Sequence, residues 1–377
     1  MTTRKIHDFL EHSRPETPCL VMDLDVIRET YGQFGRALPQ AAIFYAVKAN
    51  PAPQILTLLA GLGASFDVAS VPEVEAVLAA GVCSNRISYG NTIKKARDIE
   101  RAYALGVRQF AVDSHAEVDK VAAAAPGSRV FCRLLTDGAG ADWPLSRKFG
   151  CEPDVAVDVL RQSWRSGLDP FGLSFHVGSQ QTDPSAWYRA LKEAAGVLQK
   201  LAEEGIIIRC LTLGGGFPAR YLKDVPRSAD YGCEIMRALR AQFGNAMPDI
   251  VIEPGRGLVG NAGLIKSEVV LISRKASAAS LPWVFLDIGK FGGLAETMDE
   301  AIRYPLATAY GNAETIPFIL AGPTCDSVDV LYELKPCHLP RGLKIGDHVL
   351  IEGTGAYTAT YASVGFNGFP PLETYVV

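Results

Sequence analysis

Short apolar runs alternate with longer amphipathic segments between residues 25 and 260, and this alternation constrains the fold more than any other feature. Segments with helical patterns, such as 71–80, 94–105 and 185–204, separate most of the runs. Strands separated by helices predict a parallel sheet, and eight strands are the number that closes a (β/α)₈ barrel. An open doubly wound sheet is the alternative. The eight predicted strands are residues 42–47, 65–69, 86–90, 109–112, 129–135, 172–177, 210–213 and 249–252.

The pattern changes after residue 260. Strand-like runs follow one another at 267–274, 283–287, 318–320 and 348–352, and only 295–304 has a helical pattern. Strands without alternating helices predict an antiparallel β domain. The sequence therefore predicts a barrel over residues 25–260 and a β-barrel or sandwich formed by 1–24 and 261–377, to which a strand at 19–23 returns.

Composition excludes several classes of protein. Charged residues make up 21% of the 377 residues, the net charge is -4, and no basic tract favours nucleic-acid binding. We expect no membrane contact, because no apolar run of about 18 residues occurs. The N-terminus lacks the apolar core of a signal peptide. Eight scattered cysteines without a CxxC pair favour reduced thiols in the cytoplasm over disulfides or a metal site.

Polar residues gather at the carboxyl ends of the predicted strands, where barrel enzymes build their sites. Each of them alone is commonly structural, but their joint placement on one rim is hard to attribute to chance. A lysine that directly follows a buried strand is expected to be desolvated and nucleophilic. The rim residues are Lys48, Asp67, Arg133, His176, Gly214, Gly215, Gly216, Glu253 and Arg256.

Together these residues supply groups that can bind a phosphate, a ring nitrogen and an aldehyde. Consecutive glycines allow backbone N–H groups to surround a phosphate, and Arg256 adds a charged partner. A carboxylate such as Glu253 keeps a pyridine nitrogen protonated, Lys48 can hold an aldehyde as a Schiff base, and His176 can stack on a ring. The set predicts pyridoxal 5'-phosphate (PLP) as cofactor. No GxGxxG opens a βαβ unit and no GxxxxGK[ST] occurs, so NAD and ATP are disfavoured.

Six motifs in the same order resemble the fold-type III, alanine-racemase-fold PLP decarboxylases, with the closest likeness to the ornithine and ornithine/lysine decarboxylase group. The likeness covers about residues 18–365. The motifs are Tyr-Ala-Val-Lys-Ala-Asn at 45–50, Phe-Asp-Val-Ala-Ser at 66–70, His-Val-Gly-Ser at 176–179, Gly-Gly-Gly-Phe at 214–217, Glu-Pro-Gly-Arg at 253–256 and Gly-Pro-Thr-Cys-Asp-Ser at 322–327.

The resemblance implies a role for each matching residue. Lys48 would carry the cofactor, Glu253 would face the pyridine nitrogen and His176 would stack on the ring. Asp67 and Arg133 would orient Lys48 and the ring region. The residues expected at the phosphate are Ser179, Gly214, Gly215, Gly216, Arg256 and Tyr357.

The resemblance also implies a homodimer with shared active sites. Cys325 would be supplied by the partner subunit and protonate the substrate carbon after CO₂ leaves, and Asp326 would bind the distal ammonium of a cationic amino acid. The Gly-rich loop at 136–147 could act as a mobile lid.

The expected reaction is decarboxylation of L-ornithine to putrescine, possibly also of L-lysine to cadaverine, in polyamine biosynthesis. The segment 289–300 lacks the Tyr-Asp pair of eukaryotic ornithine decarboxylases, and Glu296, Asp299 or Glu300 could contact the distal amine instead. One methylene is worth only about 1–3 kcal/mol of discrimination, so the preference for ornithine or lysine stays open.

Other functions in the same fold remain alternatives. Diaminopimelate decarboxylase typically has Cys-Glu where this chain has Cys325 and Asp326. Carboxynorspermidine decarboxylase fits the motifs less well, and arginine decarboxylases of this fold are expected to be much longer chains. A racemase would face the pyridine nitrogen with arginine. A catalytically dead regulatory homologue typically loses cofactor residues that this chain retains.

Overall fold

The computed structural model describes residues 2–145, 148–276 and 280–377. Their contacts divide the chain into two compact units. One unit, here called the barrel unit, comprises Arg28–Pro218 and Val225–Gly257. The other, the β unit, comprises Met1–Ile27, Ala219–Asp224 and Leu258–Val377. The short segment Ala219–Asp224 therefore belongs to the β unit although it lies inside the range predicted as barrel.

Eight parallel strands close the barrel, as the alternation of strands and helices predicted. Each strand pairs with its neighbours in parallel, and β11 returns to β2, so that an open doubly wound sheet is excluded. The strands are β2 (Ala41–Ala46), β3 (Ser65–Val68), β4 (Ile87–Tyr89), β5 (Gln109–Val112), β6 (Arg129–Arg133), β8 (Asp169–Ser174), β10 (Cys210–Thr212) and β11 (Asp249–Ile252).

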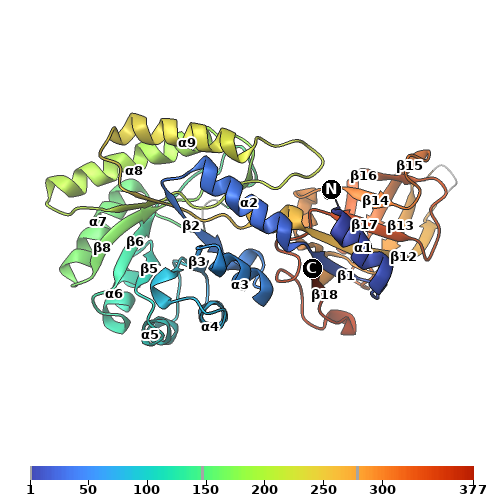
Figure 1. The fold of residues 1–377 in the computed structure, drawn as a ribbon, viewed down its shortest axis with the longest axis horizontal. Helices are drawn as coiled ribbons and strands as arrows, with labels where there is room; N and C mark the ends of the chain where they lie inside the picture. The colour runs from blue at the N-terminus through green and yellow to red at the C-terminus, as the bar shows by residue number, and fades with distance from the viewer. Residues whose placement is uncertain (1, 146–147, 277–279) are drawn as a thin grey trace. The chain divides into compact units, whose positions relative to one another are not determined.

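Helices connect these strands and cover the outside of the barrel (Figure 1). They form where the apolar positions recur with helical spacing and where a cap can start them. The α4 helix, for example, begins after Ser70, whose Oγ accepts the backbone N–H of Glu73, and proline occupies its first turn. The helices of the barrel unit are α3 (Pro53–Gly61), α4 (Val71–Ala79), α5 (Ala96–Ala104), α6 (His115–Ala124), α7 (Pro153–Arg165), α8 (Ala186–Glu203) and α9 (Ser228–Phe243), with α2 (Leu24–Ala37) crossing the boundary between units.

The β unit is built on a long mixed sheet. Its main order is β14-β17-β12-β13-β15-β16, and β1 joins it by antiparallel pairing with β12, which confirms the predicted return of the N-terminal strand. Two pairs, β13 with β15 and β1 with β18, are parallel, so the sheet is not wholly antiparallel as predicted. The elements are α1 (Arg4–Ser13), β1 (Cys19–Met22), β12 (Gly263–Arg274), β13 (Pro282–Leu286), β14 (Leu306–Thr308), β15 (Thr315–Ala321), β16 (Val330–Pro340), β17 (His348–Glu352) and β18 (Glu373–Val376).

The helix predicted at 295–304 is wrong in extent and in type. A π-helical turn at Lys290–Leu294 is followed by a 3₁₀ segment at Ala295–Glu300. Asp299 and Glu300 have positive φ angles of 53° and 54°, which no continuing α-helix allows. The apolar spacing of this short segment could not reveal these reversals of the backbone.

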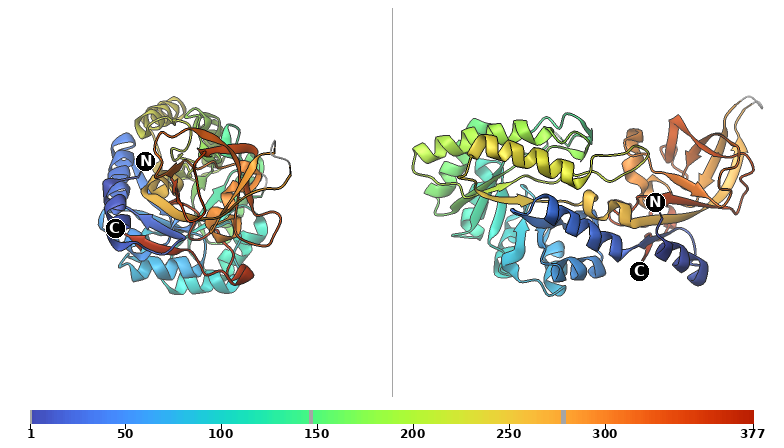
Figure 2. Two further views of the ribbon diagram at one scale, coloured as in Figure 1. Left: turned by 90° about the vertical axis from the view of Figure 1, so that its right-hand side faces the viewer. Right: turned by 45° about the horizontal axis from the view of Figure 1, so that its top comes forward.

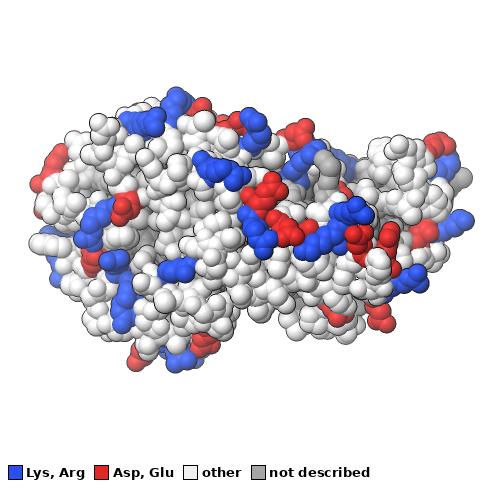
Figure 3. All heavy atoms as spheres, viewed as in Figure 1, with Lys and Arg blue, Asp and Glu red and all other residues white. Residues whose placement is uncertain are grey.

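Surface charge agrees with the composition. Lysine and arginine side chains are interspersed with aspartate and glutamate on the face drawn in Figure 3. Among the described residues, no helix has the length and apolar character needed to cross a membrane.

An aromatic cluster anchors the α8 helix to the barrel. Trp187 is completely buried, and its ring packs on Phe217 at 5.1 Å and on Tyr231 at 5.6 Å between centroids. Its Nε1 donates to the carbonyl oxygen of Leu213, 3.1 Å away. Figures 1 and 2 show that α8 lies beside α9, which contributes Tyr231. The cluster thus fixes the chain directly before the three glycines at 214–216.

Trp187→Phe is expected to lower the free energy of unfolding by about 2 kcal/mol, because it leaves the buried Leu213 carbonyl without its donor and removes ring contacts. Urea unfolding followed by circular dichroism measures the loss. Trp164→Phe is the matched control: Trp164 is 59% exposed, so its replacement should change stability by less than about 0.5 kcal/mol. Equal losses in the two variants would contradict this view of the core.

Candidate functional site

Lys48 lies on a tight turn that begins where β2 ends. Val47–Ala49 form one 3₁₀ turn, and the Tyr45 hydroxyl fixes it by donating to the carbonyl oxygen of Asn50 at 2.8 Å. The Nζ of Lys48 forms an ion pair with Oδ2 of Asp67, 2.8 Å away on β3. The Lys48 side chain is 47% exposed, which corrects the expectation of a desolvated amine. A carboxylate partner, rather than burial, dominates its surroundings.

Asp67 binds Lys48 through only one of its two carboxylate oxygens. Its Oδ1 is buried and has no hydrogen-bond partner in the described chain. Gly90, at the end of β4, makes room for it: a Cβ at Gly90 would lie 1.9 Å from that oxygen. A buried polar atom without a partner is costly, so this oxygen points to a donor group of a bound molecule.

Glu73 is a neighbour that sequence reasoning missed. Its Oε2 accepts the backbone N–H of Ala69 at 2.7 Å, and its own N–H donates to Ser70. Burial raises its pKa. Ser70-x-x-Glu73 has the sequence spacing of a capping box and could have indicated that this side chain binds the backbone before the helix, although its carboxylate accepts the N–H of Ala69 rather than that of Ser70.

The three glycines after β10 form a turn that tolerates no side chain. Gly214 and Gly216 have φ angles of 69° and 97°, in the left-handed region that favours glycine. A Cβ on Gly215 would lie 2.7 Å from the carbonyl oxygen of Glu253, and one on Gly216 would lie 2.6 Å from that of Gly178. The turn can therefore present backbone atoms closely to a ligand.

Arg256 and Ser179 complete this cradle. Arg256 is 3% exposed at the start of the short helix α10 (Arg256–Val259), and its Nε and an Nη each donate to Oγ of Ser179 at 3.2 Å. Backbone amides, a buried guanidinium and a hydroxyl are the donors that bind a phosphate.

His176 follows β8 and is held as a neutral ring. Its Nδ1 accepts the backbone N–H of Gly178 at 3.1 Å, which leaves the proton of the neutral ring on Nε2. Burial, with the positive charges of Arg133 and Lys48, lowers the pKa of His176 to about 3. The ring is therefore uncharged at neutral pH and suits a flat aromatic partner.

Glu253 directly follows β11. Burial, together with the negative charge of Asp67, raises its pKa to about 8. A carboxyl group that holds its proton near neutral pH can share that proton with a ring nitrogen. The orphaned oxygen of Asp67, the glycine cradle and this carboxyl group all fit PLP.

Arg133, the last residue of β6, lies 5.3 Å from the ring centre of Phe149. Arg133 belongs to the barrel unit and lies at the carboxyl end of a strand. The same holds for the other rim residues, which are Lys48, Asp67, His176, Ser179, Gly214, Gly215, Gly216, Glu253 and Arg256. Their individual roles toward a ligand stay predictions.

The Gly-rich loop predicted as a lid is attached to the segment that carries His176 and Ser179. Its β7 strand (Ala141–Trp143) pairs with β9 (Ser179–Gln181), and Gln181 Nε2 donates to the carbonyl oxygen of Ala139 at 2.9 Å. Ser146 and Arg147 lie outside the described residues.

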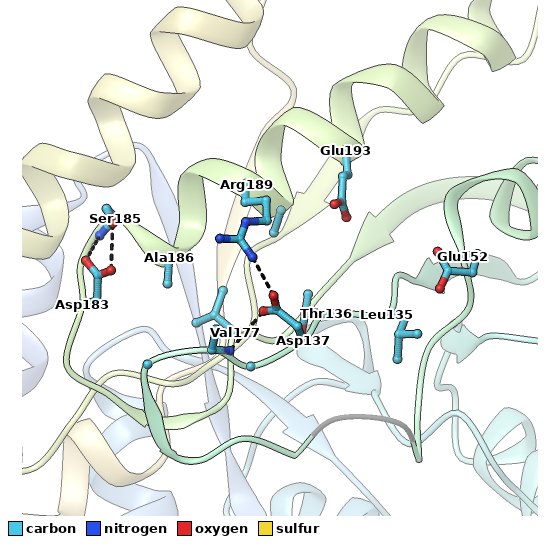
Figure 4. Close-up of a pocket in the computed structure, with 14 residues that line it drawn as sticks. Leu135, Thr136, Asp137, Glu152, Val177, Asp183, Ser185, Ala186, Arg189 and Glu193 are labelled. Carbon is cyan, nitrogen blue, oxygen red and sulfur yellow. Dashed lines mark hydrogen bonds and ion pairs between the residues drawn. The ribbon is translucent and has the colours of Figure 1, made fainter.

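A pocket of about 630 Å³ lies beside this loop (Figure 4). Asp137 and Arg189 pair across it, 2.5 Å apart, and Glu193 projects into it from α8. The residues that line this pocket include none of the rim residues, such as Lys48, Glu253 and Arg256.

The remaining predicted residues belong to the β unit. Cys325 is exposed, and its backbone N–H donates to Oδ1 of Asn367 at 3.0 Å. Asp326 Oδ1 accepts the N–H of Val328 at 2.9 Å. Tyr357 is partly buried with a φ of 61°.

Asp329 organises the turn that carries Cys325, and sequence reasoning missed it. It is 2% exposed, and its carboxylate accepts the Lys290 N–H at 2.8 Å and the Thr324 hydroxyl at 2.7 Å. Gly289 and Gly322 leave the space that the Asp329 side chain occupies, because a Cβ on either glycine would lie within 2.4 Å of a carboxylate oxygen. The repeated aspartate at 326 and 329 was the available signal.

The three acidic candidates at 296–300 differ sharply. Glu296 is 5% exposed, whereas Asp299 is exposed. Glu300 accepts the backbone N–H groups of Glu333 at 2.7 Å and Leu334 at 2.6 Å, and it pairs with Arg303 at 2.5 Å. Internal partners thus already occupy the carboxylate of Glu300.

Comparison with known proteins agrees with this geometry. Residues 24–260 match the model of the family described as pyridoxal-dependent decarboxylase, pyridoxal binding domain. A lysine/ornithine decarboxylase of Selenomonas ruminantium is 38% identical over 365 residues, covering 96% of this chain and 90% of the relative. The crystal structure of a Vibrio vulnificus lysine/ornithine decarboxylase complexed with cadaverine superposes with a TM-score of 0.88 at 33% identity, covering all of both chains.

The comparisons also correct one expectation from the sequence. An arginine decarboxylase of Paramecium bursaria Chlorella virus has a TM-score of 0.88 at 28% identity, covering 99% of this chain and 99% of its own. Arginine decarboxylases of this fold are therefore not always longer chains. Length does not exclude arginine as a substrate.

The matches span both units and extend over nearly the whole chain. The closed barrel, the rim residues and the relatives lead to one conclusion. The chain belongs to the fold-type III PLP-dependent decarboxylases, in the ornithine/lysine decarboxylase group.

Proposed function

We propose that this decarboxylase converts L-ornithine to putrescine and also accepts L-lysine, giving cadaverine, as a step of polyamine biosynthesis. The observation that carries the proposal is the lysine–aspartate pair on the same barrel rim as the glycine cradle, in a chain 38% identical to a lysine/ornithine decarboxylase. A cytoplasmic location stays a prediction from the sequence.

PLP bound at the rim supplies an electron sink for the electron pair that remains on Cα when CO₂ leaves. Nζ of Lys48 is the group that binds the aldehyde carbon of the cofactor, and Asp67 orients it. Ser179, Arg256 and the glycine turn hold the phosphate. Glu253 holds a proton at the pyridine nitrogen, and the neutral ring of His176 packs on the cofactor ring.

The residues of the β unit act on the substrate. Cys325 delivers its Sγ proton to Cα, and it comes from the second copy of a homodimer. Its exposure supports this role, because a thiol at the surface of one chain is available to the site of another. Asp329 holds the turn that presents it. Tyr357 is proposed as a further phosphate ligand.

Recognition of the distal ammonium falls to Asp326 and Glu296. Glu296 is the favoured candidate in its segment, because its carboxylate is buried and solvent ions screen a buried ion pair least. A carboxylate reached through a flexible chain of methylenes discriminates weakly between ornithine and lysine.

The purified protein with added PLP is expected to form putrescine from L-ornithine and cadaverine from L-lysine, with kcat/KM values within about 200-fold of each other because they differ by one methylene. L-Arginine and meso-diaminopimelate, offered in parallel, should give no more than traces of agmatine and lysine. Chromatography of the amines measures all four reactions. Agmatine or lysine as the main product would contradict the proposed substrate.

Glu296→Gln should raise KM for both substrates about tenfold or more, since it removes one charged contact to the distal ammonium. Asp299→Asn is the matched control on the same segment and should leave KM unchanged. Equal effects of the two substitutions would argue against Glu296 as the contact.

The shared site can be tested by mixing two inactive variants. Lys48→Ala and Cys325→Ala subunits, mixed in equal amounts and allowed to exchange, should recover about a quarter of wild-type activity, because half of the dimers are mixed and each contains one intact site. Exchange is followed independently with two affinity tags. No recovery despite proven exchange would count against a site shared between subunits.

A further inference from the structure

Two cysteines meet at the end of β6, directly beside Arg133. The Sγ atoms of Cys132 and Cys151 are 3.6 Å apart. All eight cysteines are free thiols, and no second sulfur–sulfur hydrogen bond occurs in the ranges that the structure describes. This pair is not needed for any step of the proposed reaction.

The two cysteines differ in their exposure to solvent. Cys132 is completely buried in the barrel wall, whereas Cys151 is partly exposed. Cys151 forms an isolated β-bridge with the chain just after β6. Its N–H donates to the carbonyl oxygen of Arg133 at 3.0 Å, and its carbonyl oxygen accepts the N–H of Leu135 at 2.9 Å. Gly150 next to it donates to Oδ2 of Asp113 at 2.9 Å.

The hydrogen bonds of the pair also indicate the acceptor to which each thiol donates its proton. Cys151 Sγ donates to the Arg133 carbonyl oxygen, 3.6 Å away, so its sulfur is left to accept the proton of Cys132. This hydrogen bond and burial both raise the pKa of Cys132. Cys132 thus stays a protonated thiol, and the partly exposed Cys151 is the cysteine of the pair that solvent reaches more readily.

We propose that Cys132 and Cys151 are a redox-active pair that closes to an intramolecular disulfide and reopens on reduction. A disulfide needs the sulfur atoms about 2.05 Å apart, so the pair must approach by about 1.5 Å. The close-packed barrel wall holds Cys132, and the partly exposed Cys151 is the residue that moves.

Hydrogen peroxide is a sufficient oxidant. Cys151 releases its S–H proton, and the thiolate attacks one peroxide oxygen. The O–O bond breaks, Cys151 sulfenic acid forms, and the departing hydroxide takes up the released proton to give the first water. The sulfur of Cys132 then attacks the Cys151 sulfur and displaces hydroxide, which takes up the proton of Cys132 and leaves as water. In total the two thiols lose two electrons and two protons, and the peroxide is reduced to two waters. A dithiol reductant reverses the oxidation by thiol–disulfide exchange.

Closure is expected to disturb the site through Arg133. The carbonyl oxygen of Arg133 accepts the backbone N–H of Cys151, and the carbonyl oxygen of Cys151 accepts the N–H of Leu135, two residues further along. Moving Cys151 toward Cys132 strains both bonds and shifts the last residue of β6. Arg133 is a candidate contact of the cofactor ring region, so this consequence, unlike the disulfide itself, rests on the proposed function.

The experiment treats the PLP-loaded enzyme with hydrogen peroxide, blocks the remaining thiols and maps peptides by mass spectrometry. We expect a cross-linked peptide pair containing Cys132 and Cys151, lighter by two hydrogens and lost on treatment with dithiothreitol. Sulfinic acid at Cys151, or oxidation confined to the exposed Cys83, Cys233 and Cys325, would overturn the proposal.

Variants separate the pair from the other thiols. Cys151→Ala and Cys132→Ala should each abolish the cross-linked peptide, and Cys233→Ala, an exposed cysteine on α9, should leave it intact. Reversible loss of decarboxylase activity should be about tenfold greater in wild type than in Cys151→Ala, because a displacement of an ångström near the reacting groups is costly. Oxidation of Cys325 would affect both proteins equally. If wild type forms the disulfide but loses no more activity than Cys151→Ala, the proposed link between the disulfide and Arg133 is wrong.

Discussion

Closure of eight parallel strands is the constraint on which the rest of this protein depends. Because all eight strands run in one direction, their carboxyl ends meet at a single rim, and residues as distant in the chain as Ile43 and Ile252 become neighbours. The ion pair between Lys48 and Asp67, 2.8 Å long, joins the ends of adjacent strands β2 and β3. Arg256 and Ser179, 77 positions apart in the chain, meet by the same geometry.

The rim concentrates charge and keeps much of it out of water. Glu253 gains a raised pKa and His176 a lowered one, because burial disfavours the charged form of each. The result is a carboxyl group that holds a proton and an imidazole that does not. This combination suits a flat, anionic cofactor with a basic ring nitrogen, and it explains why the same groups would be costly in an ordinary core.

Strand–helix alternation was sufficient to predict the barrel, since each strand is buried on both faces and carries a nearly continuous apolar run. The rim residues followed from their position after those strands. Other features could not be predicted from the sequence. Orientation of β13 and β15 depends on pairing between distant segments, the reversals at Asp299 and Glu300 depend on tertiary contacts, and Asp329 acts only through the space left by Gly289 and Gly322.

The proposed attachment of the cofactor to Lys48 can be tested at one atom. Borohydride reduction of the PLP-loaded protein fixes the pyridoxyl group on the amine to which it is bound, and peptide mass mapping then locates it. We predict a single labelled peptide that carries the group on Nζ of Lys48. A label on any other lysine, with Lys48 unmodified, would contradict it.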